Sequence, residues 1–311
     1  MTQAALKKTF YSNGKLLITG EYTVLDGAKA LALPTIMGQY LDIESNEGET
    51  IYWKSFDSDD SVWYEDEFAL PDIKQNKQDA IIPETNILIK ILHEAWLANP
   101  EILSNNGFTI TTRLTFPRQW GLGTSSTLIN NIAQWFGINA FDLLAKSFGG
   151  SGYDIACAQH DTPILYHLED AKPIVELVDF NPAFADKLYF VYLNRKQNSR
   201  QAILAYRENR RSIAPTITKI DALTEKVLHT SGLNAFCITL EEHEAIMSDV
   251  LRLPTMKQLV FPDFNGTIKS LGAWGGDFVL AVANENPEAY FRSKGFETII
   301  AYNDMIKRSI D

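Results

Sequence analysis

Hydrophobic and polar positions alternate along much of the first third of the chain, a pattern that predicts β-strands. The alternation is cleanest in GFTITTRLTFP (107–117). Three earlier segments are rich in β-branched and aromatic residues and are separated by Gly, Asp and Asn: KLLITGEYTVL (15–25), QYLDIES (39–45) and TIYWKSF (50–56). The charged stretch DSDDSVWYEDE (57–67) predicts a hairpin or an exposed loop, and IKQNKQDAIIPET (73–85) predicts a connector.

Two segments in the N-terminal half of the chain have the hydrophobic period of an α-helix. NILIKILHEAWLA (86–98) places its apolar residues on one helical face, with Thr85 as the expected cap. TSSTLINNIAQWF (124–136) is the second helix, and it follows the strand predicted over 107–117 after a short glycine-containing loop. The order strand, loop, helix is one that places backbone N–H groups at a helix start, where an anion can bind.

The C-terminal part shows a different order of elements. From Lys187 the patterns predict a strand, three helices, two strands, a helix and a last strand. The segments are KLYFVYLN (187–194), SRQAILAYRENRRS (199–212), ITKIDALTEKVLH (217–229), NAFCITLEEHEAIMSDVLR (234–252), TIKSL (267–271), DFVLAVA (277–283), NPEAYFRSKG (286–295) and FETIIA (296–301). This order is typical of a split βαβ, ferredoxin-like domain. We therefore expect an α+β protein of two domains, residues 1–175 and 176–311.

Bulk properties exclude several classes of function. A chain of 311 residues corresponds to about two domains, and 45% hydrophobic residues indicate a sizeable core. The net charge of −11 argues against nucleic acid or an anionic membrane as the partner. No apolar run is long enough to span a membrane, and the N-terminus lacks a signal-peptide core, so we expect a cytoplasmic protein. The two cysteines form no CxxC pair, which makes a disulfide framework or a thiolate metal site unexpected.

Three segments are rich in glycine, and the overall composition does not indicate their function. They are GKLLITGEYTVLDGAKALALP (14–34), PRQWGLGTSST (117–127) and KSLGAWGGDFVLA (269–281). Each has an ordinary interpretation when taken alone, as a turn between strands, a helix cap or a tight loop. The second segment is not a Walker A loop, because GxxxxGK[ST] occurs nowhere in the chain.

Taken in order, the three segments resemble the motifs of the GHMP kinases, the family of galactokinase, homoserine kinase, mevalonate kinase and phosphomevalonate kinase. The resemblance extends over nearly the whole chain, with modest departures at Thr124 and Ser126 and larger ones at Trp274 and Asp277. It implies the two-domain GHMP kinase fold, with an N-terminal domain like ribosomal protein S5 domain 2 that binds ATP and a ferredoxin-like C-terminal domain. It also implies ATP and Mg²⁺ as cofactors.

The resemblance assigns roles to individual residues. Asp154, in GGSGYDIACAQ (149–159), corresponds to the aspartate that accepts or orients the acceptor's hydroxyl proton, and Lys15 to the lysine beside the acceptor hydroxyl and the γ-phosphate. Ser125 corresponds to the Mg²⁺-binding serine. The nucleotide-binding residues implied are Gly121, Leu122, Gly123, Thr124, Ser125, Ser126 and Thr127, and the substrate-binding residues are Glu21, Lys196, Ser199, Gly272, Ala273, Gly275 and Gly276. A turn or cap is the alternative reading of Asp154, and a solvated helix start that of Lys196 and Ser199.

The acceptor stays open between two compounds. GEYTVLDG resembles the GEYAV of phosphomevalonate kinases and, less closely, the GEHAV of mevalonate kinases, whereas the chain length is nearer to a compact mevalonate kinase. We therefore expect an isoprenoid-pathway kinase that phosphorylates mevalonate or phosphomevalonate, as a monomer or a homodimer. The alternatives are a catalytically silent relative that senses a nucleotide or metabolite, and a GHMP kinase with an unrelated acceptor.

Overall fold

The computed structural model describes residues 7–104, 106–195, 199–209 and 213–308. The strands are β1 (Lys8–Leu17), β2 (Ala30–Asn46), β3 (Thr50–Phe56), β4 (Val62–Ala69), β5 (Gly107–Leu114), β6 (Ile164–Glu169), β7 (Lys172–Leu177), β8 (Leu188–Tyr192), β9 (Thr267–Ser270), β10 (Phe278–Val282) and β11 (Ile299–Ala301). The α-helices are α1 (Leu70–Lys74), α2 (Pro83–Ala98), α3 (Thr124–Phe136), α4 (Ala140–Ser147), α5 (Tyr153–Gln159), α6 (Ser199–Asn209), α7 (Ala214–His229), α8 (Leu233–Leu251), α9 (Met256–Leu259), α10 (Glu288–Ser293) and α11 (Tyr302–Met305). Short 3₁₀ turns are η1 (Thr23–Asp26), η2 (Pro100–Leu103), η3 (Arg118–Trp120) and η4 (Ala185–Lys187).

The chain forms two compact units, each assembled from separate stretches of sequence. Unit 1 contains Met1–Gly14, Met37–Arg118 and Leu122–Gln159, and unit 2 contains Lys15–Ile36, Gln119–Gly121 and His160–Asp311. The mixed α+β composition expected from the sequence is confirmed. The domain boundary between residues 175 and 176 stays a prediction.

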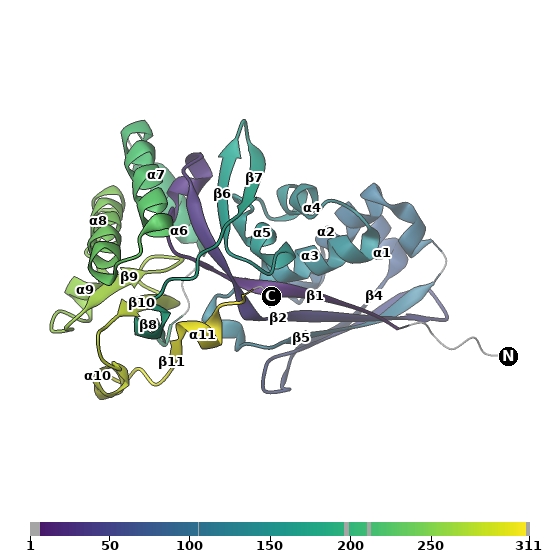
Figure 1. The fold of residues 1–311 in the computed structure, drawn as a ribbon. Helices are drawn as coiled ribbons and strands as arrows, with labels where there is room; N and C mark the ends of the chain where they lie inside the picture. Colours follow the sequence, from purple (N-terminus) through teal and green to yellow (C-terminus); the bar gives the residue numbers. More distant parts are fainter. Residues whose placement is uncertain (1–6, 105, 196–198, 210–212, 309–311) are drawn as a thin grey trace. The chain divides into compact units, whose positions relative to one another are not determined.

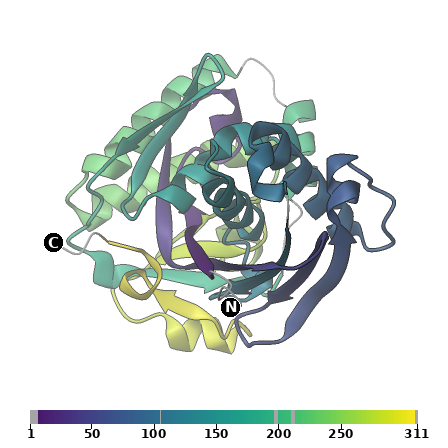
Figure 2. The ribbon, with the colours of Figure 1, turned by 90° about the vertical axis from the view of Figure 1, so that its right-hand side faces the viewer.

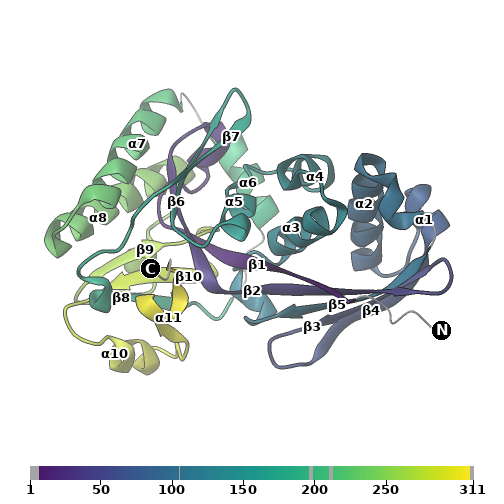
Figure 3. The same cartoon turned by 45° about the vertical axis from the view of Figure 1, so that its right-hand side comes forward.

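In unit 1, helices cover one face of a twisted sheet. The strand order is β4-β3-β5-β2, with β1 paired to β2. Strand β3 runs parallel to β5 and antiparallel to β4. Helices α1 to α4 lie on the same side of these strands (Figures 1 and 3). This arrangement lets the apolar faces of the helices and of the sheet exclude water together.

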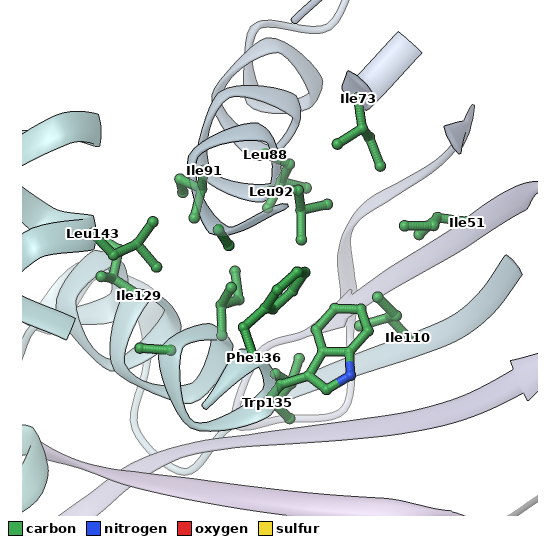
Figure 4. Packing of buried hydrophobic residues seen from close by; sticks show 14 of the residues in the cluster. Ile51, Ile73, Leu88, Ile91, Leu92, Ile110, Ile129, Trp135, Phe136 and Leu143 are labelled. Carbon is green, nitrogen blue, oxygen red and sulfur yellow. The ribbon is translucent and has the colours of Figure 1, made fainter. Parts of the chain in front are cut away.

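The core of unit 1 lies between those helices and the sheet. Figure 4 shows Trp135 and Phe136 of α3 packed between Leu92 of α2 and Ile110 of β5, and all four belong to one buried apolar cluster. The Trp135 ring also meets Phe108 of β5 edge to face, with centroids 5.0 Å apart. Helix α3 is thereby fixed at its C-terminal end, far along the helix from the glycine-containing loop that precedes it.

In unit 2, the C-terminal strands have the order β11-β8-β10-β9, and their pairings are antiparallel. The chain order is β8, the four helices α6 to α9, β9, β10, α10 and β11, so the expected split βαβ, ferredoxin-like arrangement is confirmed, with the short helix α9 in addition to the three helices predicted. Helices α7 and α8 lie side by side (Figures 1 and 2). The β6–β7 hairpin adds to unit 2 through the pairing of β6 with residues 30–32 of β2.

Two local expectations are wrong. Residues 15–25 are not one strand, because β1 ends at Leu17 and η1 follows; Gly20 has φ +83° and Tyr22 φ +59°, values that end an extended backbone. Thr85 does not cap a helix. Helix α2 begins earlier, at Pro83, which suits a first helical turn, and the buried Thr85 hydroxyl instead bonds Tyr64 Oη at 2.9 Å and the Asp66 carboxylate.

A buried ionic cluster joins the first and third glycine-rich segments inside unit 2. We define it as Glu21, His243, Glu244 and Lys269. Lys269 Nζ on β9 is 2.5 Å from Glu21 Oε1 and 3.4 Å from Glu244 Oε2. The Glu244 carboxylate also accepts hydrogen bonds from the backbone N–H and the hydroxyl of Ser270. None of the four side chains is more than 4% exposed.

Burial changes the protonation of this cluster. It raises the pKa of Glu21 from 4.5 to about 7, although the Lys269 ammonium acts in the opposite direction. Burial, followed by the same ammonium, lowers the pKa of His243 well below 6.5. His243 Nε2 accepts the Gly20 N–H at 3.0 Å, which a neutral imidazole can do and an imidazolium cannot. The cluster therefore holds the backbone of the first glycine-rich segment through an uncharged histidine.

These two shifts act on stability with opposite signs. Folded Glu21 keeps its proton to about pH 7 while the unfolded residue loses it near 4.5, so its contribution to the unfolding free energy falls as pH rises between those values. Folded His243 stays neutral while the unfolded residue binds a proton below pH 6.5, so its contribution falls as pH drops below 6.5.

We expect His243→Gln to change the pH dependence of folding. The amide oxygen of Gln still accepts the Gly20 N–H, but the histidine contribution disappears. From pH 5 to 6.5 the unfolding free energy of the variant should therefore decline relative to the wild type by about 1.5 kcal/mol, measured by urea denaturation. Glu21→Gln should shift the slope in the other direction. His229→Gln, at an exposed histidine of α7, is the matched control, and equal slopes in all four proteins would contradict both assignments.

Candidate active site

The second glycine-rich segment lies where the sequence placed it, between a strand and a helix. Strand β5 ends at Leu114, η3 covers Arg118–Trp120, and α3 begins at Thr124. Gly123 precedes the helix with φ +102° and, as a glycine at the N-cap, has no side chain to cap the first turn. The first N–H groups of a helix have no intrahelical acceptor, and at an end without a side-chain cap they are available to water or to an anion.

The hydroxyl residues of this turn have different surroundings. Ser126 is buried and donates from Oγ to the Gly123 carbonyl at 2.8 Å. Thr127 is also buried, and its hydroxyl donates to Gln39 Oε1 at 2.7 Å. Ser125 is exposed. Of these three hydroxyls, that of Ser125 is the one on the solvent side of the helix start, where a ligand can reach it.

A polar network missed by the sequence analysis holds this helix in unit 1. Asn130 Nδ2 donates to Ser12 Oγ at 2.8 Å, and Ser12 Oγ donates to Asn131 Oδ1 at 2.7 Å. Asn131 Nδ2 donates to the Gln39 carbonyl at 2.9 Å. Buried amides need such partners, because an unpaired buried polar group is costly. The network therefore fixes α3 against β1 and β2, and the only signal for it in the sequence is the Asn-Asn pair inside an otherwise apolar helix.

Asp154 lies at the start of a different short helix of unit 1. It is the second residue of α5, is half-buried, and its Oδ1 is 3.1 Å from the Ile155 N–H. Gly149, Gly150 and Gly152, with φ of +70°, +117° and +91°, form the turn before it. Helix α5 packs on α3, where Gln159 Nε2 donates to Asn130 Oδ1 at 3.0 Å. Asp142, twelve residues earlier, is exposed in the first turn of α4.

Lys15 and the start of the second segment come together in unit 2. Lys15 Nζ donates to the Gly121 carbonyl at 2.9 Å. Gly121 has φ +67°, a conformation that favours glycine. The preceding residue, Trp120, packs edge to face on Phe278 with ring centroids 5.5 Å apart. The lysine predicted to act on phosphate is therefore bound to the first glycine of the predicted phosphate loop, although 106 residues separate them.

The first and third segments also meet in unit 2. The Trp274 N–H donates to Tyr22 Oη at 2.7 Å, and the Trp274 indole N–H donates to the Pro254 carbonyl at 3.0 Å. Tyr22 and Trp274 belong to one buried apolar cluster with residues of α6, α7 and α8. Trp274 is therefore part of the core of unit 2. Gly272 and Gly275 adopt left-handed φ values, +69° and +80°, and the Gly276 N–H closes a turn on the Ala273 carbonyl.

The remaining predicted residues are placed as follows. Leu122 is fully buried. Glu21 belongs to the buried ionic cluster and is 2% exposed, so its place in an acceptor site stays a prediction. Lys196 lies outside the described residues, and Ser199 is described only as the first residue of α6. Unit 1 thus holds Ser125 and Asp154, and unit 2 holds Lys15, Gly121 and the third segment.

The described residues contain neither a metal-binding cluster nor a membrane-spanning helix. Among them, no three His, Cys, Asp or Glu side chains gather in a way that could hold a metal ion. Over the same residues, no helix has both the length and the apolar character required to cross a membrane.

Comparison with known proteins identifies the fold. No protein-family model matches the chain, and no curated protein sequence is similar to it. Solved structures are similar throughout. Mevalonate kinase from Methanococcus jannaschii aligns with a TM-score of 0.69 and 14% identity over 99% of this chain and 100% of that one. Streptococcus pneumoniae phosphomevalonate kinase, in complex with phosphomevalonate and AMPPNP, aligns with a TM-score of 0.70 and 16% identity over 94% and 99%.

A sugar kinase shares the same arrangement. Lactococcus lactis galactokinase, in complex with galactose, aligns with a TM-score of 0.67 and 15% identity over 93% of this chain and 88% of that one. These structures share a kinase fold but differ in acceptor. The chain therefore has the fold of the GHMP kinases.

Proposed function

We propose that the protein is a small-molecule kinase that transfers the γ-phosphate of ATP to mevalonate or phosphomevalonate. The observation that carries the proposal is the start of α3: left-handed Gly123, no side-chain cap and an exposed Ser125, within a chain of kinase fold. Backbone N–H groups and the helix dipole at such a start favour a phosphate. That a solved phosphomevalonate kinase of this fold binds AMPPNP supports ATP as the donor.

Lys15 supplies the positive charge that phosphoryl transfer requires. Its ammonium donates to the Gly121 carbonyl, directly before the residues proposed to bind the triphosphate. Charge accumulates on the oxygens of the transferred group and on the leaving oxygen, and a preorganised cation stabilises it. The hydrogen bond to Gly121 keeps Lys15 in place before the reaction, so that little reorganisation is needed.

Asp154 orients the acceptor hydroxyl and accepts its proton. The preceding glycines place the carboxylate at the start of α5, half-buried rather than fully solvated. A carboxylate within hydrogen-bond reach of a hydroxyl can align it for in-line attack, and positioning supplies most of the catalysis in phosphoryl transfer.

Mg²⁺ fits the donor set of the described residues. Mg²⁺ keeps several waters and is usually held by one or two protein groups together with substrate phosphates. The exposed Ser125 hydroxyl is such a single donor, and no all-protein cage occurs among the described residues. When bound, the ion would neutralise phosphate charge. We also propose that the protein acts in the cytoplasm, as a monomer or a homodimer.

The first experiment measures ADP release from ATP and Mg²⁺ with mevalonate, phosphomevalonate, homoserine and galactose supplied separately. Release that depends on one of the first two acceptors supports the proposal and identifies the acceptor. If ATP raises the melting temperature but none of the four is phosphorylated, the proposed acceptors are wrong. The protein is then a nucleotide-binding sensor or a kinase with another acceptor.

We expect Asp154→Asn to lower turnover by roughly 10²–10⁴ because the amide cannot take up the hydroxyl proton. Nucleotide affinity, measured by titration calorimetry with MgADP, should change little. Asp142→Asn removes an exposed carboxylate from the first turn of α4 and is the matched control, with full activity expected. Unchanged turnover in Asp154→Asn would remove the residue from the mechanism, and an unfolded variant would assign it to structure.

We expect Ser125→Ala to raise the Mg²⁺ concentration needed for half-maximal activity, because one donor to the ion is lost. The measurement is a Mg²⁺ titration at fixed total ATP. Ser58→Ala, in the exposed turn of the β3–β4 hairpin, serves as the control. Superimposable Mg²⁺ titrations for Ser125→Ala and the wild type would show that the hydroxyl does not contact the ion.

A further inference from the structure

Asp277 stands at the end of the third glycine-rich segment, where the resemblance to the GHMP kinases led us to expect a small residue. In this chain it is a carboxylate, 7% exposed, in the loop between β9 and β10. Its φ of +51° lies in the left-handed region, which costs free energy for a residue with a side chain. Such a conformation persists only where its surroundings hold it, so the contacts of Asp277 indicate what it does.

The carboxylate lies against Gly121. A Cβ atom built on Gly121 would be 2.2 Å from Asp277 Oδ2 and 2.8 Å from Oδ1, so a side chain at position 121 would require the Asp277 carboxylate to move. The carbonyl of the same glycine accepts the hydrogen bond from Lys15 Nζ. A negative and a positive side chain thus contact one residue, at the point where the second glycine-rich segment begins.

The C-terminal sheet of unit 2 holds Asp277 in this position. Its N–H donates to the Arg195 carbonyl at 3.0 Å, and its carbonyl accepts the Leu193 N–H at 2.8 Å, so the backbone is bound on both sides just beyond β8. Tyr192, at the end of β8, donates from Oη to the Gln119 carbonyl at 3.2 Å. Burial, and then the charge of Asp277, raise the pKa of Tyr192, which agrees with a carboxylate close to this phenol.

We propose that Asp277 is a positioning residue for phosphoryl transfer: its carboxylate fixes Gly121, and thereby the carbonyl that holds the Lys15 ammonium. The proposal rests on the kinase function proposed above. A negative charge beside a loop that binds phosphate opposes binding of the nucleotide, so the residue does not serve affinity. The Asp277 carboxylate instead positions the Lys15 ammonium. Its removal should therefore lower turnover and leave nucleotide binding unchanged.

The test compares Asp277→Asn with the wild type in kcat, in the KM for ATP and in the dissociation constant of MgADP. We expect kcat to fall about 10²-fold, the cost of misplacing a reacting group by roughly 1 Å, while the dissociation constant stays the same or decreases. Asp263→Asn changes an exposed carboxylate of unit 2 that is paired with Lys294 and is the matched control. If nucleotide affinity and melting temperature fall together with kcat, Asp277 is structural and the proposal is overturned.

A second measurement does not depend on activity. Gly121→Ala introduces a Cβ against the carboxylate, and Asp277→Gly removes that carboxylate. The loss of melting temperature caused by Gly121→Ala should therefore be at least halved in the Asp277→Gly background, which leaves only the strain at φ +67°. Equal losses in the two backgrounds would contradict the contact on which the proposal is built.

The outcomes separate this proposal from the proposed function. A wild type that phosphorylates its acceptor, together with a fully active Asp277→Asn, overturns the role of Asp277 and leaves the kinase function intact. A wild type that phosphorylates no acceptor overturns the kinase function, and the role of Asp277 in transfer falls with it.

Discussion

The buried pair of Glu21 and Lys269 is the interaction on which the organisation of unit 2 depends. Transfer of two charges from water into a protein interior costs several kcal/mol per ion, and only close pairing with further hydrogen bonds offsets that cost. Here the Lys269 ammonium lies between two carboxylates, and the second of these, Glu244, is satisfied by Ser270. Any conformation that separates the first glycine-rich segment from β9 would break the contact between Glu21 and Lys269.

Contacts from distant side chains also hold the glycine loops, although glycine itself allows a loop many conformations. His243 fixes the N–H of Gly20, Tyr22 accepts the N–H of Trp274, and Lys15 and Asp277 both contact Gly121. In each case a side chain far away in the sequence binds the backbone of a loop. Since catalysis of phosphoryl transfer depends on groups placed in advance, these contacts supply what the proposed kinase function needs from its scaffold.

In unit 1, uncharged groups hold the helix that follows the second glycine-rich segment. The network of Ser12, Asn130 and Asn131 fixes α3 below the proposed phosphate site, and the aromatic residues Trp135 and Phe136 anchor the other end of the helix. The amides avoid the cost of buried charge but require complete pairing. The two units thus hold their glycine-rich loops and helices by different chemistry, ionic in unit 2 and amide in unit 1.

The sequence by itself determined the regular elements and the three glycine-rich segments. The α3 and α8 helices and the β3, β5 and β10 strands follow from hydrophobic periods of 3.6 and 2, which are local properties, and the ferredoxin-like order follows from their succession. Locality also explains the errors at residues 15–25 and at Thr85, where a left-handed glycine and a proline set boundaries that periodicity does not show.

Only the tertiary structure decided what individual polar residues do. Ser125, Ser126 and Thr127 look alike in the sequence, but one hydroxyl is exposed and two are bonded within unit 1. Glu21 looks like a surface charge and is buried, and Asp277 looks like an irregularity of a motif and contacts the second segment. The physical reason is that partners distant in the sequence set the environment of a polar side chain. Gln39 lies 88 residues from Thr127 and Lys269 lies 248 residues from Glu21, and no local pattern contains such partners.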